Sequence, residues 1–216
     1  ARDQAGCLVG VPMNANVPLV VGIDLAGSPN RFTGVCAMTG RRVTASAAVQ
    51  TDAEILALVE AARPDLVTID APLRLPPGRR SLEDRNGEHF RPCDRELLRR
   101  GIKFFPITLG PMRMLTMRGI RLRKRLEKAG IPALEMYPGG AQDTWGIRRK
   151  QYGLPRLRAG LERLGISGTT PDMTHDELDA VTGAYVGVLY LQGRAELIGD
   201  ERTGGILLPY ATKGRR

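Results

Sequence analysis

A single acidic residue inside an apolar run constrains this chain more than any other feature of its sequence. Residues 18–28 are rich in β-branched side chains and close at Gly27, a pattern that predicts a buried strand followed by a turn. Asp24 stands within this run. A carboxylate in a central strand loses its hydration, so it needs a nearby cation, a hydrogen-bond donor or a proton. The fold must therefore bring such a partner to this strand.

Four further acids stand where an expected strand ends or an expected helix begins. Asp176 and Asp179 are three residues apart in the first turn of a helix, so their side chains project from the same side. The helix dipole alone accounts for Asp176, whereas Asp179 opens a helix that is apolar nearly all round. We expect these acids to meet in one pocket and to serve as both catalytic residues and metal ligands: Asp24, Asp70, Glu135, Asp176 and Asp179.

A pocket built from carboxylates favours metal chemistry. Without cations the pKa values of clustered acids rise and some of the acids protonate. Ligand sets made only of oxygen select hard cations, so Mg²⁺ or Mn²⁺ is the expected occupant. Two such ions about 3.5–4 Å apart can activate water and stabilise the leaving oxygen of a phosphodiester. We expect Asp24 to bridge two ions, and Glu135 to bind metal or to position water.

The positive charge of the chain is concentrated in its middle. The 216 residues carry a formal net charge of +9, and residues 74–128 hold 16 Lys and Arg against 6 Asp and Glu. The remainder is close to neutral. This distribution favours a polyanionic partner such as DNA or RNA, and an arginine-rich solvated surface is the alternative.

Six basic residues are candidates for contact with nucleic-acid phosphates. Three lie on one side of an expected helix at residues 112–129, and the others lie in loops. Salt bridges to Asp94 or Glu88 are an equally good explanation for the two arginines beside Cys93, and a solvated loop is the alternative for the lysine. The candidates are Arg91, Arg95, Arg118, Arg121, Arg125 and Lys150.

The order of the expected elements indicates an α/β fold with a mixed sheet. Two antiparallel strands at residues 31–38 and 42–49 follow the first strand, and a helix leads to a returning strand at residues 66–70. We expect residues 18–216 to form one domain with an irregular basic insertion at about residues 74–111. Residues 1–17 form an N-terminal extension outside this fold.

The cysteines and the hydropathy bear on location. Three cysteines without paired spacing (Cys7, Cys36 and Cys93) favour a reducing cytoplasm over a disulfide framework. No apolar run is long enough to cross a membrane, so we expect no membrane partner. A homodimer is expected only if the substrate is a four-way junction, because an enzyme that resolves junctions needs a symmetric dimer, and the sequence shows no identifiable dimer surface.

Five short segments, in order, resemble a known family. They are GIDLAG at 22–27, IDAPL at 69–73, RPCDREL at 91–97, EMYP at 135–138 and DELDA at 176–180. Together they resemble the nuclease family with an RNase H fold grouped as domain of unknown function 429, which is related to RuvC and YqgF-type nucleases. The resemblance implies a mixed five-stranded sheet flanked by helices, with the acidic motifs at Asp24, Asp70, Glu135, Asp176 and Asp179.

Three functions are compatible with these observations. The first is a metal-dependent nuclease that cuts DNA or RNA with two ions. The second is an inactive protein that binds nucleic acid or acts as a scaffold on the same fold. The third follows from the likeness of residues 22–27 to the phosphate-binding turn of sugar-kinase and actin-like ATPases, although those folds use two such domains. Stabilisation by a metal ion or by ATP would separate them.

Overall fold

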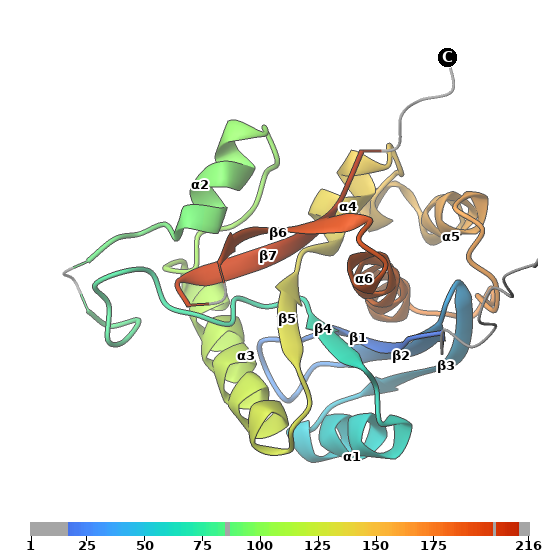
Figure 1. The fold of residues 1–216 in the computed structure, drawn as a ribbon, viewed down its shortest axis with the longest axis horizontal. Coiled ribbons are helices and arrows are strands. Elements are labelled where there is room, and N and C mark those ends of the chain that lie inside the picture. The colour runs from blue at the N-terminus through green and yellow to red at the C-terminus, as the bar shows by residue number, and fades with distance from the viewer. Residues whose placement is uncertain (1–16, 85–86, 201, 212–216) are drawn as a thin grey trace, which may run out of the picture.

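The computed structural model of the chain describes residues 17–84, 87–200 and 202–211. Within them, seven strands form one sheet in the order β3-β2-β1-β4-β5-β7-β6 (Figure 1). Strands β3, β2 and β1 are antiparallel neighbours, and β4, β5 and β7 run parallel to β1. The strands are β1 (Leu19–Asp24), β2 (Thr33–Thr39), β3 (Arg42–Val49), β4 (Leu66–Ile69), β5 (Ala133–Met136), β6 (Ala195–Asp200) and β7 (Gly204–Pro209).

The expectation of a mixed α/β sheet flanked by helices is confirmed, but the expected number of five strands is too small. The first five strands have the expected arrangement, and the hairpin of β6 and β7 extends the sheet beyond β5. The sequence does predict a hairpin at residues 196–209. It does not show that β7 continues the sheet, because that pairing joins segments about 70 residues apart (Glu135 with Ile206).

Helices cover both faces of the sheet (Figure 1). On one face α6, α5 and α4 share a core with alternate residues of β1 and β2, while α1 and α3 pack with the other residues of β1 and β4 on the opposite face. The helices are α1 (Asp52–Ala62), α2 (Pro92–Arg99), α3 (Gly110–Lys128), α4 (Pro138–Thr144), α5 (Leu154–Arg163) and α6 (His175–Leu191), with the 3₁₀ turn η1 (Lys150–Tyr152). None of the described helices is long and apolar enough to cross a membrane.

The alternation of side chains along β1 decides which way Asp24 points. Val21 and Ile23 pack in the core beneath α1 and α3, and Val20 packs in the core beneath α6. Because successive side chains of a strand point to opposite faces, Gly22 and Asp24 share the α6 face with Val20. Asp24 therefore lies at the end of β1, on the side where α6 begins.

Two glycines let α6 lie against the backbone of the sheet. A Cβ on Gly22 would come within 2.1 Å of the Ala180 carbonyl oxygen, and one on Gly34 within 2.1 Å of the Asp176 carbonyl oxygen. No side chain fits in that space, so glycine is required at both positions. Gly34 pairs with Asp24 across β1 and β2. The close approach therefore brings the first turn of α6 beside Asp24.

Two helices begin where capping residues in the sequence predict, whereas a third helix was not expected. Capping boxes begin α1 at Thr51 with Glu54 and α6 at Thr174 with Glu177, as their S/T-x-x-E spacing predicts. A helix also begins at Pro138, directly after β5, although proline and glycine usually end regular structure. Proline is well suited to the first position of a helix because that position needs no N–H donor.

Candidate metal centre

Two adjacent strands place the first two acids of the site. Strands β1 and β4 are parallel neighbours in which Ile23 pairs with Ile69, and the Asp70 N–H donates to the Ile23 carbonyl at 2.8 Å. Asp24 and Asp70 thus occupy matching positions at the same edge of the sheet. Their carboxylates interact electrostatically, since the charge of Asp70 contributes to the raised pKa of Asp24.

The start of α6 supplies the other two acids. Asp176 and Asp179 lie in its first turns, and both interact electrostatically with Asp24. Their side chains are 22% and 7% exposed, against 12% for Asp24, so the group is mostly buried but is still reached by solvent. We call these four residues the acid cluster: Asp24, Asp70, Asp176 and Asp179.

The acid cluster lacks enough positive charge and donors to balance it. Within the described residues, Asp24 Oδ2 is a buried atom with no hydrogen-bond partner. Burial, and then the charges of Asp70 and Asp179, raise the pKa of Asp24 well above its usual range. Burial and the charge of Asp179 likewise raise the pKa of Asp70 to about 7. Shifts caused by burial together with specific charged neighbours mark a candidate functional site.

Lys150 of η1 provides part of the missing charge. Its Nζ lies 2.9 Å from Asp179 Oδ2 and 4.0 Å from Asp24 Oδ2. Burial would lower the pKa of Lys150, but the charges of Asp179 and Asp24 outweigh it and the pKa is raised. Gln142 Nε2 donates to Asp179 Oδ1 at 2.7 Å. This ammonium group and this amide both pair with Asp179, one of the four carboxylates.

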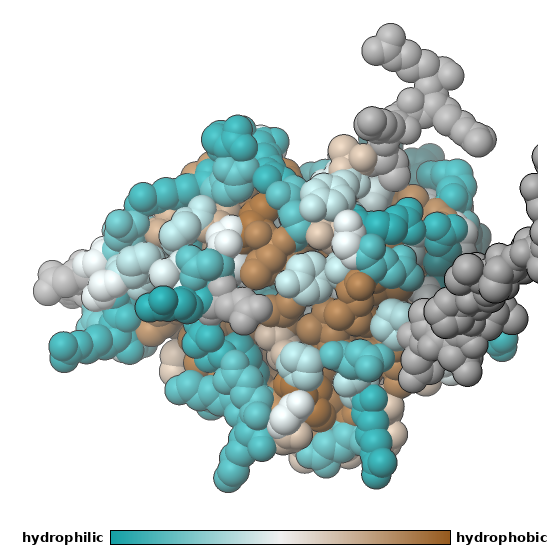
Figure 2. Space-filling view, in the orientation of Figure 1, coloured by the Kyte–Doolittle hydropathy of each residue, from teal (hydrophilic) through white to brown (hydrophobic). Residues whose placement is uncertain are grey.

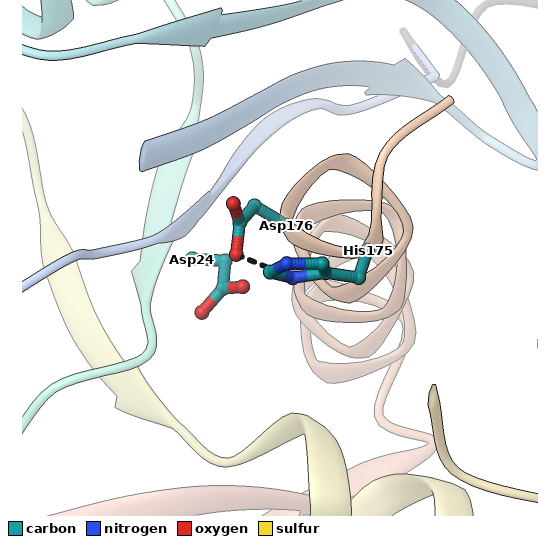
Figure 3. Close-up of side chains that lie close together, drawn as sticks. All are labelled: Asp24, His175 and Asp176. Carbon is teal, nitrogen blue, oxygen red and sulfur yellow. Dashed lines mark ion pairs between the residues drawn. The ribbon is translucent and has the colours of Figure 1, made fainter. Parts of the chain in front are cut away.

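His175 is a site residue that the sequence analysis did not identify. It is the first residue of α6, and its Nδ1 lies 2.7 Å from Asp176 Oδ1 (Figure 3). Atoms of Asp24, His175 and Asp176 that could bind metal all lie within 4.8 Å of one another. The sequence did contain a signal for His175. It stands between the helix cap Thr174 and Asp176, so it lies in the same first turn of α6 as Asp176.

The residues of this site fit a divalent cation. Carboxylate oxygens are the ligands that Mg²⁺ prefers, and Mn²⁺ also accepts an imidazole nitrogen. The unpartnered oxygen of Asp24 and the raised pKa values of Asp24 and Asp70 show that the acid cluster is not balanced by the protein alone. Asp24, Asp70, Asp176 and Asp179 would hold such an ion, and His175 is placed to join them.

Glu135 lies on the opposite face of the sheet from the acid cluster. It pairs with Ile69 on β4, and Met136 is the residue of β5 that packs under α6. Its carboxylate accepts two hydrogen bonds from the Arg91 guanidinium, at 2.6 and 2.8 Å, and one from the Leu73 N–H at 2.9 Å. These bonds supply the carboxylate with the partners that the acids on the other face lack, so we no longer count Glu135 as a metal ligand.

Arg91 holds Glu135 and Asp94 together in the interior. Its Nη2 lies 2.8 Å from Asp94 Oδ1, and only 2% of its side chain is exposed. Burial alone would lower the pKa of Arg91, but the charges of Glu135 and Asp94 raise it well above its usual range. We call Arg91, Asp94 and Glu135 the Arg91 network. Four of its five N–H donors already bond to these carboxylates and the side chain is buried, so the expected nucleic-acid contact at Arg91 is withdrawn.

The other basic candidates divide between the interior and the surface. Arg118 is 2% exposed and donates to Asp52 Oδ1 at 2.7 Å and to two backbone carbonyls, so it too is withdrawn as a phosphate contact. Arg95 is exposed and paired with Glu88, which is the alternative that the sequence left open. Arg121 and Arg125 are exposed on α3. Lys150 faces the acid cluster rather than open solvent alone.

Comparison with known proteins gives a family and two similar solved structures. RuvC of T. thermophilus in complex with a Holliday junction substrate is 14% identical, with a TM-score of 0.48 over 81% of this chain and 96% of that one. The Thermus thermophilus RuvC structure is 16% identical, with a TM-score of 0.46 and the same shares covered. No curated protein matches the chain. The model of the family described as protein of unknown function (DUF429) matches residues 22–203. Since this match spans most of the chain, the protein belongs to the DUF429 family.

Proposed function

We propose that this protein is a metal-dependent nuclease that hydrolyses phosphodiester bonds of DNA or RNA. The observation that carries the proposal is the buried oxygen of Asp24 that has no hydrogen-bond partner within the described residues, among three further carboxylates at one sheet edge. A protein that used these acids only for folding would pair them, as it pairs Glu135 with Arg91. One or two Mg²⁺ or Mn²⁺ ions bound there would activate water and neutralise charge on the phosphate.

The residues of the chain have distinct parts in this proposal. Asp24 and Asp70 form the base of the site because both are fixed by strands, and Asp176 and Asp179 complete it from α6. Gln142 holds the orientation of Asp179 through its 2.7 Å hydrogen bond. Lys150 is 44% exposed, so its ammonium group is free to turn from Asp179 toward a phosphate when a cation enters the acid cluster.

Exposed arginines near the site supply a surface for the nucleic-acid backbone. Arg148, Arg156 and Arg163 line an open hollow of about 500 Å³ beside η1 and α5. For these three arginines, the described part of the chain gives no acidic partner. On another face of the molecule, hydrophilic side chains run along α3 (Figure 2), where Arg121 and Arg125 are exposed. Such arginines neutralise phosphates without reading sequence.

The proposal includes a cytoplasmic location, and the oligomeric state that it proposes depends on the substrate. Cys36 and Cys93 are both free thiols in the structure, in keeping with a reducing compartment. A symmetric homodimer is part of the proposal only if four-way junctions are the preferred substrate, because two symmetric cuts need two sites.

Cleavage of a labelled panel tests the proposal. The panel holds single strands, duplexes, RNA–DNA hybrids and four-way junctions, each with Mg²⁺, Mn²⁺ or chelator, and Asp24→Asn is the matched variant. We expect cutting that requires metal and falls about a thousandfold or more in Asp24→Asn. Absence of cutting in every arm, together with salt-dependent binding, would instead identify an inactive nucleic-acid-binding protein.

A further inference from the structure

A largely apolar cavity of about 170 Å³ lies next to the acid cluster and has no part in the function proposed above. Asp70 belongs to its wall, so the cavity and the metal centre share a residue. Phe104, Phe105 and Tyr137 supply an aromatic side, and Met112 and Leu115 of α3 also line it. A cavity of this size accepts one planar ring, since an engineered apolar cavity of about 150 Å³ binds benzene.

Two of the three aromatic rings are held in place, and the third is free. Tyr137 donates its hydroxyl to the Lys103 carbonyl at 2.7 Å, and Phe104 packs edge-on against Phe90 with ring centroids 6.1 Å apart. Phe105 is 70% exposed. Burying a phenylalanine is favourable, so Phe105 would gain free energy by packing against an occupant of the cavity.

The charges around the cavity indicate what enters. The Arg149 guanidinium lies over the Tyr137 ring at 5.6 Å and donates to Asp143 and to the Tyr137 hydroxyl, so it helps to hold this ring in place. The carboxylates of Asp94 and Glu135 also line the cavity, and carboxylate oxygens can accept more hydrogen bonds than one guanidinium supplies. An occupant with a flat apolar face and a donor edge matches the aromatic wall and these acceptors.

We infer that this cavity holds one nucleobase of the substrate, next to the phosphate that is cut. The inference rests on the nuclease function proposed above and narrows its substrate class. A base can enter only after it leaves the stack of its neighbours, which costs least where the nucleotide is already unpaired. Stacking on aromatic side chains is worth about 1–3 kcal/mol per base. Single-stranded or locally unpaired nucleotides are therefore the preferred substrate.

Binding of short oligonucleotides tests this inference. Fluorescence anisotropy with Mg²⁺ measures the affinity for a mixed-sequence single strand and for the duplex of the same sequence. The protein carries Asp24→Asn so that nothing is cut. Phe105→Ala is added to it, and Tyr210→Ala is the control, because Tyr210 is an aromatic residue of similar exposure (53%) outside the cavity. A set of strands with an abasic nucleotide at each position in turn locates the bound base.

The inference predicts a loss of single-strand affinity in Phe105→Ala that the control variant does not show. Phe105→Ala should weaken single-strand binding by about fivefold to a hundredfold, while Tyr210→Ala should leave it unchanged. The loss should vanish for the strand whose abasic position matches the cavity, because the base and the ring then no longer interact. If Phe105→Ala binds single strands as tightly as the control, the cavity does not hold a base. The inference then fails, while the nuclease proposal stands. If the protein binds neither strands nor duplex, the nuclease proposal fails and the inference with it.

Discussion

The two groups of acids at the end of this sheet have the same kinds of residue but opposite environments. In the Arg91 network, Asp94 and Glu135 share a guanidinium that is buried with them. In the acid cluster, four carboxylates have one half-exposed ammonium, and an oxygen of Asp24 has no hydrogen-bond partner among the described residues. In the first group each carboxylate has a guanidinium partner. In the second group the partners are fewer than the acids, and we propose that a cation binds there.

The face of the sheet separates the two groups. Ile23, Ile69 and Glu135 lie in register on β1, β4 and β5, so they share one face, and the next residues on β1 and β4, Asp24 and Asp70, turn to the other face. A difference of one position along a strand thus decides whether an acid meets Arg91 or α6. Acids at the same sheet edge therefore need to be sorted by face before any of them is assigned to a site.

Removing Arg91 should have the largest effect on stability. Arg91→Met leaves the carboxylates of Asp94 and Glu135 buried without a counter-charge, and we expect a loss of about 3–5 kcal/mol in the free energy of unfolding. Arg95→Met is the control, because the pair of Arg95 with Glu88 is exposed and should contribute less than about 1 kcal/mol. Urea denaturation of both variants measures the difference. Equal losses would show that the Arg91 network is not structural.

The acid cluster should make stability depend on pH in the opposite sense to an ordinary paired acid. The pKa of Asp70 rises from 3.8 to about 7 on folding. Its stabilising contribution is therefore full below about pH 4 and is lost as the pH rises through 7. Relative to Asp70→Asn, the metal-free protein should lose roughly 2–4 kcal/mol between pH 3 and pH 8.

Thermal unfolding of both proteins with chelator, and again with Mg²⁺, measures this dependence. Mg²⁺ should remove most of the loss at pH 8, because the bound cation favours the charged form of the acid. A constant difference between the two proteins across the pH range would show that Asp70 titrates as an ordinary surface acid.

Replacing Lys150 should have the smallest effect on stability. It should slightly destabilise the metal-free protein and should strengthen metal binding. Lys150→Met removes the ammonium beside Asp179, so the metal-free protein should lose about 1 kcal/mol or less, while Mn²⁺ should bind several-fold more tightly. Arg156→Met also removes one positive charge, but from the exposed helix α5, and so controls for the effect of net charge on Mn²⁺ binding. Calorimetry with Mn²⁺ provides the comparison. Weaker Mn²⁺ binding in Lys150→Met alone would mean that Lys150 supports the metal rather than substituting for it.

Local patterns in the sequence predict the strands and capped helices but not the pairing of distant residues. Thr174, Glu177 and the apolar run of α6 identify the helix that carries Asp176 and Asp179, and those two acids do lie beside Asp24. The face on which Glu135 lies depends on strand register, which no short pattern contains. The same limit applies to Arg91, whose partner Glu135 is 44 residues away.

The most direct test compares one acid from each face. Asp24→Asn on β1 and Glu135→Gln on β5 each change a carboxylate near the same edge of the sheet into an amide, and calorimetry with Mg²⁺ and Mn²⁺ measures metal binding to the folded proteins. We predict that wild type and Glu135→Gln bind metal with similar affinity, whereas Asp24→Asn loses binding and melts at an equal or higher temperature without metal. Unchanged binding in Asp24→Asn, or equal loss in both variants, would contradict the assignment of the metal centre to the acid cluster.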